Sequence, residues 1–538
     1  MYADDIILFS KASNKNAANM VSILEKYCKW SGQMVNYSKS GVFFSKHTLP
    51  NTQRAIKSIL QVKKLKKDVV YLGTPMFLLR APSKSFSYLH EKLEAKLSDW
   101  RSKCLSWAGR ETLINSVVQT IPNYTMSTFN VPTLVCDKLD SLARKFWWKP
   151  KERDGKFLAW KSWEKLCLPK GAGGLGFKKS KDINNALLAK LAWMIASNRE
   201  SLCMTILRAK YKVKGDWLRS DPIKAASPIW RAIESTKSLV VKRACYLVGD
   251  GTSINIWTDP WVPWLQGFIP KPKSPALPNP PTKVSSLINH NLHCWKPHII
   301  NNVFETQSAQ AILSIPIPIT SKADKLCWTL ESKGAFTVKS AYKASLSHLP
   351  THSTPLVDWK KIWKLNAPQR IKMFLWRLGN NVLPTRENIS HRLDIPITSC
   401  VLCKKELESL HHIFFKCDIV RALWFAVCWG FKAEHCPTTS PESIINLVLN
   451  PSLPSSQLQD QWVISLNIAL TLEEIWRIRN DALFNKSTPD IQHSISIIQH
   501  RLKEASLVLG ICSPSVPNPH PLPPTPSPLL VSSSSRLD

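Results

Sequence analysis

The chain has 538 residues, and its 72 Lys and Arg outnumber 38 Asp and Glu, which gives a formal net charge of +34. This length is enough for several folded units, and 44% hydrophobic residues excludes a chain that is disordered throughout. The charge favours a polyanionic partner, nucleic acid or an anionic membrane surface, over the alternative of a merely soluble basic protein.

Neither a membrane span nor a targeting signal is visible in the sequence. No uninterrupted apolar run approaches the roughly 18 residues of a membrane helix, and the acidic start Met-Tyr-Ala-Asp-Asp is unlike a secretory or transit peptide. The 14 cysteines are much sparser than in a disulfide-rich scaffold, which favours a reducing compartment. We therefore expect a nuclear or cytoplasmic protein without a membrane partner.

The first 80 residues show a mixed pattern. Tyr-Ala-Asp-Asp at residues 2–5 precedes a strand-like apolar run at 6–9, and apolar residues then recur at helical spacing until Gly32, a typical helix end. Further strand candidates are 41–44 and 69–72, the second of which ends at Gly-Thr-Pro. The fold class predicted here is α+β.

Helical periodicity then dominates, from about residue 85 to 148 and again from 184 to 195. The glycine cluster at 171–176 lacks the spacing of a phosphate-binding loop, so an ordinary glycine turn is the favoured interpretation. After a Pro- and Lys-rich stretch come strand-like pieces at 327–329 and 335–338 and a Trp-rich helical pattern at 359–380. The tail from Ser513 is dominated by Pro and Ser and is expected to be disordered.

Two groups of residues have metal-binding chemistry. Asp4 and Asp5 at a tight turn could present carboxylate oxygens to Mg²⁺, although an exposed acidic turn is the alternative. The stronger signal is C-x2-C-x8-H-x4-C, formed by Cys400, Cys403, His412 and Cys417. Three thiolates and one imidazole complete a tetrahedral shell, so this pattern predicts a structural zinc site.

Some alternatives remain open around the zinc motif. His411 is an adjacent candidate for the fourth ligand, and the spacing could also arise by chance. The preceding stretch combines indole rings with basic residues, listed here: Lys360, Lys361, Lys364, Arg370, Lys372 and Arg377. Such a surface can neutralise phosphates and stack unpaired bases, but the tryptophans can equally form the apolar core around the zinc unit.

The order of Tyr-Ala-Asp-Asp, a helix, Gly-Gln-Met-Val-Asn-Tyr-Ser-Lys-Ser at 32–40 and Tyr-Leu-Gly-Thr-Pro at 71–75 resembles the palm motifs of plant LINE-type (non-LTR) retrotransposon reverse transcriptases. The resemblance implies that Asp4 and Asp5 are a catalytic metal-binding pair. It also implies nucleotide and primer contacts for these residues: Asn36, Lys39, Ser40, Tyr71, Leu72, Gly73 and Pro75.

The resemblance continues far beyond the palm. Residues 359–385 and 400–417 resemble the zinc-binding domain of the same polyproteins, and 476–480 resembles the helix that precedes their RNase H module. The acidic tetrad of an RNase H does not appear, so no nuclease activity is expected. RNA and DNA are the expected partners, and zinc is the expected structural cofactor.

One departure from the family matters for activity. The family takes a third catalytic aspartate from a strand upstream of Tyr-Ala-Asp-Asp, and this chain starts one residue before that motif. Two-metal phosphoryl transfer needs carboxylates from separate strands, so we expect no polymerase activity from this chain alone, with Mg²⁺ binding only in a complete palm. The alternatives are a non-enzymatic protein-interaction module built on the zinc domain, or an incomplete gene model of an active enzyme.

We therefore predict a multidomain α+β protein: a partial palm, a mostly helical thumb and connector, and a small Cys3His zinc-binding domain. The expected units are a palm portion (1–80), a helical thumb-like domain (81–200), a connector (201–340) with a linker at 265–285, the zinc-binding domain (341–430), a helical region (431–510) and a tail (511–538).

Overall fold

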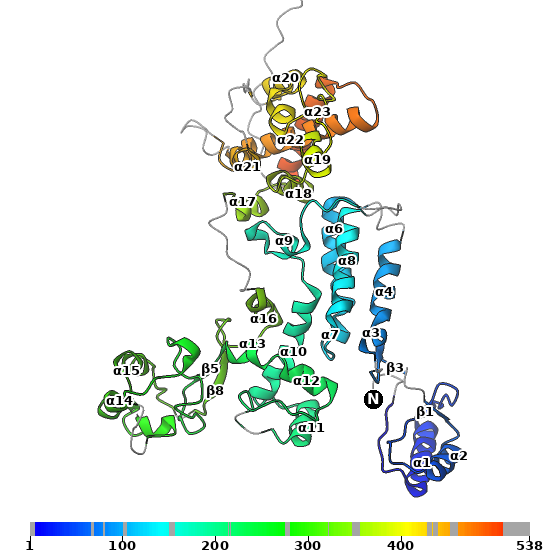
Figure 1. Cartoon of the computed structure of the whole chain (residues 1–538), viewed down its shortest axis with the longest axis vertical. Helices are drawn as coiled ribbons and strands as arrows, with labels where there is room; N and C mark the ends of the chain where they lie inside the picture. Colours follow the sequence, from blue (N-terminus) through cyan, green and yellow to red (C-terminus); the bar gives the residue numbers. More distant parts are fainter. Residues whose placement is uncertain are drawn as a thin grey trace, which may run out of the picture.

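The computed structural model describes residues 6–65, 69–78, 81–99, 105–149, 157–213, 215, 217–274, 280–320, 322–346, 356–427, 433, 440–451 and 461–508. Within these residues the chain is mostly helical, and its strands form four two-stranded sheets (Figure 1). An α+β class with few strands is therefore confirmed at this coarse level. No helix in the described ranges is long and apolar enough to cross a bilayer. Asp4, Asp5 and the Pro/Ser tail lie outside the described residues.

The N-terminal segment, residues 6–78, contains two helices that pack on each other, α1 (Asn14–Ser31) and α2 (Pro50–Leu60). The Ser13 hydroxyl accepts a hydrogen bond from the Asn16 N–H and caps the start of α1, and Gly32 ends it with φ 71°. Strand β1 (Gly41–Val42) pairs in parallel with β2 (Lys63–Lys64), and β3 (Val70–Tyr71) pairs antiparallel with β4 (Thr74–Pro75). The helix and its predicted glycine stop are confirmed.

The strand predicted at residues 6–9 is wrong. These residues have no regular secondary structure, and the side chains of Ile6, Leu8 and Phe9 are exposed. Backbone groups in a strand need a neighbouring strand to bond to, and no segment described here pairs with residues 6–9. Apolar composition alone cannot supply that partner.

The next described segments, to residue 241, are mainly helical, and three leucines at helical spacing on α4 (Leu89, Leu93 and Leu97) are buried. The helices of this region are α3 (Pro82–Ser85), α4 (Ser87–Ser98), α6 (Trp107–Leu113), α7 (Asn123–Met126), α8 (Thr133–Trp148), α9 (Trp163–Cys167), α10 (Ser180–Ala196), α11 (Leu202–Tyr211), α12 (Pro228–Glu234) and α13 (Lys237–Val241). Helix α10 contacts α7, α8, α11, α12 and α13. The buried Asn184 on α10 donates to the carbonyl oxygens of Met126 and Phe129, so a polar group also anchors this packing.

A second apolar core is inserted between two paired strands, β5 (Ala244–Leu247) and β8 (Lys325–Trp328). The insertion contains β6 (Ile288–Asn289), β7 (Cys294–Trp295), α14 (Pro297–Val303) and α15 (Thr306–Leu313). The described residues of the Pro- and Lys-rich stretch 265–285 are hydrogen-bonded to the rest of this insertion. Lys273 N–H donates to Val303 O, and Thr282 O accepts from Ile256 N–H. Proline removes a backbone donor but leaves its neighbours free to make such bonds.

The C-terminal part of the chain packs against the helices α4–α13. Its helices are α16 (Val338–Ser345), α17 (Trp359–Lys364), α18 (Gln369–Gly379), α19 (Arg386–Leu393), α20 (Asp418–Val427), α21 (Pro441–Leu449), α22 (Gln461–Phe484) and α23 (Ile491–Val508). One continuous apolar cluster runs from Phe86 to Ala505 and joins these helices to the region of α4–α13. In Figure 1, α17 and α18 accordingly lie next to α6, α8 and α9.

One of the two strand-like pieces predicted before α16 is a strand, and the other is not. The piece at 327–329 overlaps β8, whereas residues 335–337 pair with no strand in the described part of the chain, and Val338 already begins α16. The Thr337 hydroxyl accepts a hydrogen bond from Ser340 N–H and so caps this helix. The strand predicted at 335–338 is therefore wrong, because the Thr337 cap starts a helix although Thr337 and Val338 are β-branched residues typical of strands.

Candidate metal centre and the surfaces around it

Four side chains from two short segments converge after α19. The nitrogen or sulfur atoms of Cys400, Cys403, His412 and Cys417 all lie within 4.8 Å of one another. Cys400 and Cys403 lie on a tight turn, in which Cys400 N–H donates to Glu406 O and Lys404 N–H donates to Cys400 O. His412 begins the π-helical turn His412–Lys416, and Cys417 immediately precedes α20. The predicted spacing thus corresponds to one compact cluster.

The dimensions of the cluster fit a zinc ion. With Zn–S bonds of about 2.3 Å and a Zn–N bond of about 2.0 Å, the edges of a tetrahedral site are roughly 3.5–3.8 Å. The Cys403 Sγ and His412 Nε2 atoms are 3.3 Å apart, close to such an edge. Cys400, His412 and Cys417 are buried and Cys403 is partly buried, so protein atoms enclose most of the cluster. Four protein ligands leave no position for a reacting water, as expected of a structural site.

A neighbouring carboxylate sets the orientation of the imidazole. Glu406 Oε2 lies 2.8 Å from His412 Nδ1, which leaves Nε2 facing the sulfur atoms. A carboxylate in this position fixes the tautomer of a metal-binding histidine and raises its basicity. His411 instead stacks on Phe415 with ring centroids 5.9 Å apart. The structure therefore brings His412 into the cluster, a choice that the sequence left open.

The thiols of the cluster influence one another. A hydrogen bond from the Cys417 side chain, together with nearby backbone N–H groups, lowers the pKa of Cys400 to about 5. The same pairing and burial raise the pKa of Cys417. Two sulfur atoms this close share one proton and behave as a coupled pair, and a cation between them favours the thiolate form of both.

Comparison with known proteins agrees with this chemistry. Residues 336–424 match a family described as zinc-binding in reverse transcriptase, and this range contains all four side chains of the cluster. The chain is also 34% identical over 143 residues to an uncharacterized mitochondrial protein of Arabidopsis thaliana, a match that covers 26% of this chain and 92% of the relative. The chain belongs to the plant retrotransposon-derived proteins.

A longer relative extends the comparison. The chain is 30% identical over 381 residues to a putative ribonuclease H protein of Arabidopsis thaliana, a match that covers 66% of this chain and 57% of that protein. The matched part of this retrotransposon-derived chain thus corresponds to little more than half of the relative. Below, residues 336–424 are called the zinc-binding region.

Aromatic side chains around the cluster form a core. Phe414, Phe415 and Trp424 are fully buried, and the rings of Phe415 and Trp424 stack at 5.8 Å with an interplanar angle of 7°. The Trp424 indole N–H donates to the Phe414 carbonyl oxygen. These rings are therefore unavailable to stack on bases. In the stretch 359–380, Trp359 and Trp376 are buried as well, which supports the core role that the sequence left open for its tryptophans.

A buried ion pair ties the cluster to the long helix α22. Glu408 and Arg479 are 0% and 1% exposed, and Arg479 Nη2 lies 2.6 Å from Glu408 Oε1. The same carboxylate accepts a hydrogen bond from the backbone N–H of Arg386 at the start of α19. Sequence reasoning missed this pair, although an arginine within the apolar pattern of α22 and a glutamate between the metal-binding cysteines and histidine were the available signals.

The basic residues predicted for this region divide into two sets. Lys360, Lys361, Lys364 and Arg370 are exposed, whereas Lys372 and Arg377 are partly buried. The Arg377 guanidinium lies 4.4 Å from the centroid of the Trp107 ring, and that of Arg110 lies 4.5 Å from it. Burial, together with repulsion from Arg110, lowers the pKa of Arg377 to about 9. Arg377 therefore helps to join α18 to α6, whereas the exposed set lies on the surface, where Arg370 pairs with Glu473.

The glycine cluster is part of the same junction. Gly173 has φ 80°, and its carbonyl oxygen accepts a hydrogen bond from the Trp376 indole N–H at 3.0 Å. A Cβ atom at Gly173 would lie 3.0 Å from the Trp359 ring. The turn therefore lets backbone approach two tryptophans of the zinc-binding region. This geometry agrees with the ordinary glycine turn favoured from the sequence.

The predicted nucleotide and primer residues occupy two turns of the N-terminal segment. Asn36 Oδ1 accepts hydrogen bonds from Lys39 N–H and the Ser38 hydroxyl, and Asn36 O accepts one from Ser40 N–H. Leu72 and Gly73, with φ of 48° and 78°, form the two-residue turn between Tyr71 and Thr74 of the β3–β4 hairpin, which Pro75 continues. With Asp4 and Asp5 outside the described residues, the roles of these turns remain predictions.

Proposed function

We propose that this chain is a portion of a LINE-type reverse transcriptase that binds nucleic acid through surfaces organised by a structural zinc ion. The observation that carries the proposal is the Cys3His cluster, because its atoms are arranged for tetrahedral zinc and it lies within residues that match a reverse-transcriptase family. The net charge of +34 supports a polyanionic partner.

The proposal assigns palm and thumb roles to the preceding regions. Residues 6–78 would be the part of the palm that follows the catalytic turn, with the β3–β4 hairpin near the primer, and the helices from α4 to α10 would form the thumb. The support is the order of the predicted motifs and the tight turn at Leu72–Gly73. RNA and DNA would contact the exposed basic set on α17 and α18, and that contact would weaken as salt rises.

As a separate polypeptide, the chain is proposed to lack polymerase activity. Asp4 and Asp5 are adjacent in the sequence, and the next acid along the chain, Glu25, is exposed on α1. Two-metal phosphoryl transfer requires carboxylates from separate elements around both ions. Extension of a primer on an RNA template by the purified chain would overturn this part of the proposal.

The zinc and nucleic-acid parts are tested together by replacing two ligands. The variant Cys400→Ser/Cys403→Ser should lose bound zinc and bind single-stranded RNA at least about tenfold more weakly, because the surface around α18 loses its support. The matched control is Cys203→Ser/Cys294→Ser, which changes two exposed cysteines away from the cluster. Zinc content by atomic emission and RNA affinity by filter binding are the measurements.

The outcomes separate the proposed function from its alternative. Loss of zinc with unchanged RNA affinity would contradict a zinc-organised nucleic-acid surface and would favour a zinc unit that contacts protein. Absence of stoichiometric zinc in the wild-type chain would contradict the metal site itself.

A further inference from the structure

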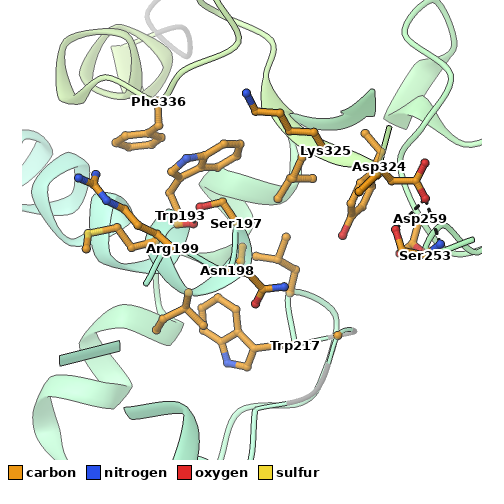
Figure 2. A pocket seen from close by; sticks show the side chains of 18 of the residues that line it. Trp193, Ser197, Asn198, Arg199, Trp217, Ser253, Asp259, Asp324, Lys325 and Phe336 are labelled. Atoms are coloured by element: carbon orange, nitrogen blue, oxygen red, sulfur yellow. Dashed lines mark hydrogen bonds between the residues drawn. The ribbon is translucent and has the colours of Figure 1, made fainter. Parts of the chain in front are cut away.

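A large cleft lies away from the zinc cluster, where the two apolar cores meet. Its volume is about 1060 Å³, and it is lined by the C-terminal part of α10, residues 213, 215, 217 and 218, the loop 250–259 and the segment around β8. Figure 2 shows Trp193 and Phe336 near each other with the Arg199 side chain beside them, and Asn198 and Trp217 farther along the cleft. Its volume is at the upper end of the roughly 300–1,000 Å³ typical of small-molecule pockets.

Aromatic rings line the cleft. Phe336 is partly exposed and stacks on Trp193 with centroids 5.9 Å apart and an interplanar angle of 21°. Trp217 is 5% exposed, and its indole N–H is buried without a hydrogen-bond partner in the described structure. A flat, partly exposed ring such as that of Phe336 is a surface on which an unpaired base can stack.

The acidic side chains of the cleft are already occupied. Six basic and three acidic residues line it. Asp324 accepts hydrogen bonds from the backbone N–H groups of Gly249, Gly251 and Ser253. Asp259 likewise accepts from Asn255 N–H, and Asp250 from Thr252. These carboxylates hold the loop 250–259 in place, so their charges are partly offset by backbone dipoles.

Four basic side chains of the cleft, by contrast, are free to contact a ligand. Lys190, Arg199, Lys325 and Lys333 are exposed, and within the described ranges their side chains make no hydrogen bond or ion pair. The C-terminal carbonyl groups of α10 would repel an anion, but Arg208 donates to the oxygens of Met194 and Ile195 and offsets that end of the helix. The cleft therefore presents positive charge beside aromatic surface.

We propose that this cleft binds a short single-stranded segment of nucleic acid, with a base stacked on Phe336 and adjacent phosphates beside Arg199 and Lys325. The inference rests on the proposed nucleic-acid binding and deepens it by locating a second contact site. A duplex buries its bases within the stack. A single strand exposes both its base rings, which can stack on Phe336, and its phosphates, which can contact the basic side chains.

The test is a double substitution with a matched control. Arg199→Ala/Lys325→Ala should weaken binding of a short fluorescent oligouridylate about tenfold at low salt, measured by anisotropy. The slope of log affinity against log salt should also fall by about 1.4, since each phosphate contact on a single strand contributes about 0.7. Lys224→Ala/Lys339→Ala removes the same charge from exposed positions outside the cleft and should leave the slope close to that of the wild type.

A third variant tests stacking separately from charge. Phe336→Leu keeps apolar packing against Trp193 but removes the ring, and it should weaken binding severalfold with an unchanged salt slope. If the cleft double variant behaves like the control while the wild-type chain binds RNA, the cleft assignment is wrong and the proposed function stands. Equal affinity for a blunt RNA duplex would also overturn it. If the wild-type chain binds no RNA at all, both proposals fall.

Discussion

The N-terminal segment and the zinc-binding region differ in how they bury apolar side chains. In residues 6–65 and 69–78 only two hydrophobic residues, Ala17 and Ile56, are buried, and ten large hydrophobic residues are exposed, including Trp30 at 84% and Met34 at 92%. In the described part of the zinc-binding region only four large hydrophobic residues are exposed. The N-terminal segment even contains the longer helix, since α1 has 18 residues and α18 has 11, so element length does not explain the difference.

The contrast shows what a short segment needs in order to be stable. Isolated two-residue strands with little apolar burial have marginal stability. The zinc-binding region contains a site for metal, the glutamate of a buried ion pair with α22 and a close contact with a glycine turn from a distant part of the chain. We therefore expect the stability of the zinc-binding region to depend on each of these three features. The stability of the N-terminal segment should not change when any of them is removed.

Removing the metal should have the largest effect. Zinc contributes roughly 10–16 kcal/mol in small zinc peptides, so chelation or Cys400→Ser/Cys403→Ser should abolish cooperative folding of residues 399–424. Hydrogen exchange followed by mass spectrometry should show lost amide protection there and unchanged exchange in residues 14–60. Equal protection in treated and untreated protein would show that the apolar core alone holds this region.

Breaking the buried ion pair should have the next largest effect. Arg479→Leu leaves the buried Glu408 carboxylate with only the longer, 3.9 Å contact to Arg386 Nε, which should lower the free energy of unfolding by about 3–5 kcal/mol. Adding Glu408→Gln removes the charge, keeps an acceptor for Arg386 N–H and should restore part of the loss. Thermal and urea unfolding are the measurements.

An exposed pair near the cluster provides the control. Lys405 and Asp418 are 2.8 Å apart with side chains 74% and 52% exposed, so Lys405→Ala should cost less than about 1 kcal/mol. Equal costs for Lys405→Ala and Arg479→Leu would mean that burial of the Glu408–Arg479 pair has no energetic consequence.

The glycine turn should matter less than the ion pair. Gly173→Ala adds strain at φ 80° and places a Cβ atom 3.0 Å from Trp359, so we expect a loss of about 1–3 kcal/mol in the free energy of unfolding. Gly176→Ala is the matched control, because Gly176 also has a positive φ but a Cβ atom there would meet nothing within 4 Å. The difference between the two variants measures the contact alone, and no difference would refute its importance.

Local spacing predicts some of these features well and others not at all. The helix at 14–31, its glycine stop and the grouping of the four metal-site residues follow from positions close together in sequence. The strand at 6–9 was wrong because strands depend on partners that apolar composition does not reveal. Zinc ligation and the palm roles of Asn36 and Lys39 stay predictions.

The unpredicted contacts join positions far apart in the chain. Arg479 meets Glu408 across 71 residues, and the Trp376 indole meets Gly173 across 203. No periodicity or motif encodes such pairs, and a basic residue such as Arg377 looks the same in sequence whether it faces solvent or packs on Trp107. Tertiary packing, rather than local propensity, decides these outcomes.

The smallest effect expected in this comparison is that of Glu406, the carboxylate that orients His412. Partners of metal-binding histidines typically contribute 10–100-fold in metal affinity, and the Glu406 side chain is 67% exposed, which favours the lower end. Glu406→Gln should therefore weaken zinc binding about tenfold, measured by competition with a chelating dye. Asp418→Asn removes the same charge beside Cys417 without touching the imidazole, so its effect should be much smaller. Equal weakening by both would assign the effect to net charge around the cluster, whereas the expected difference shows that the hydrogen bond to Nδ1 positions the histidine.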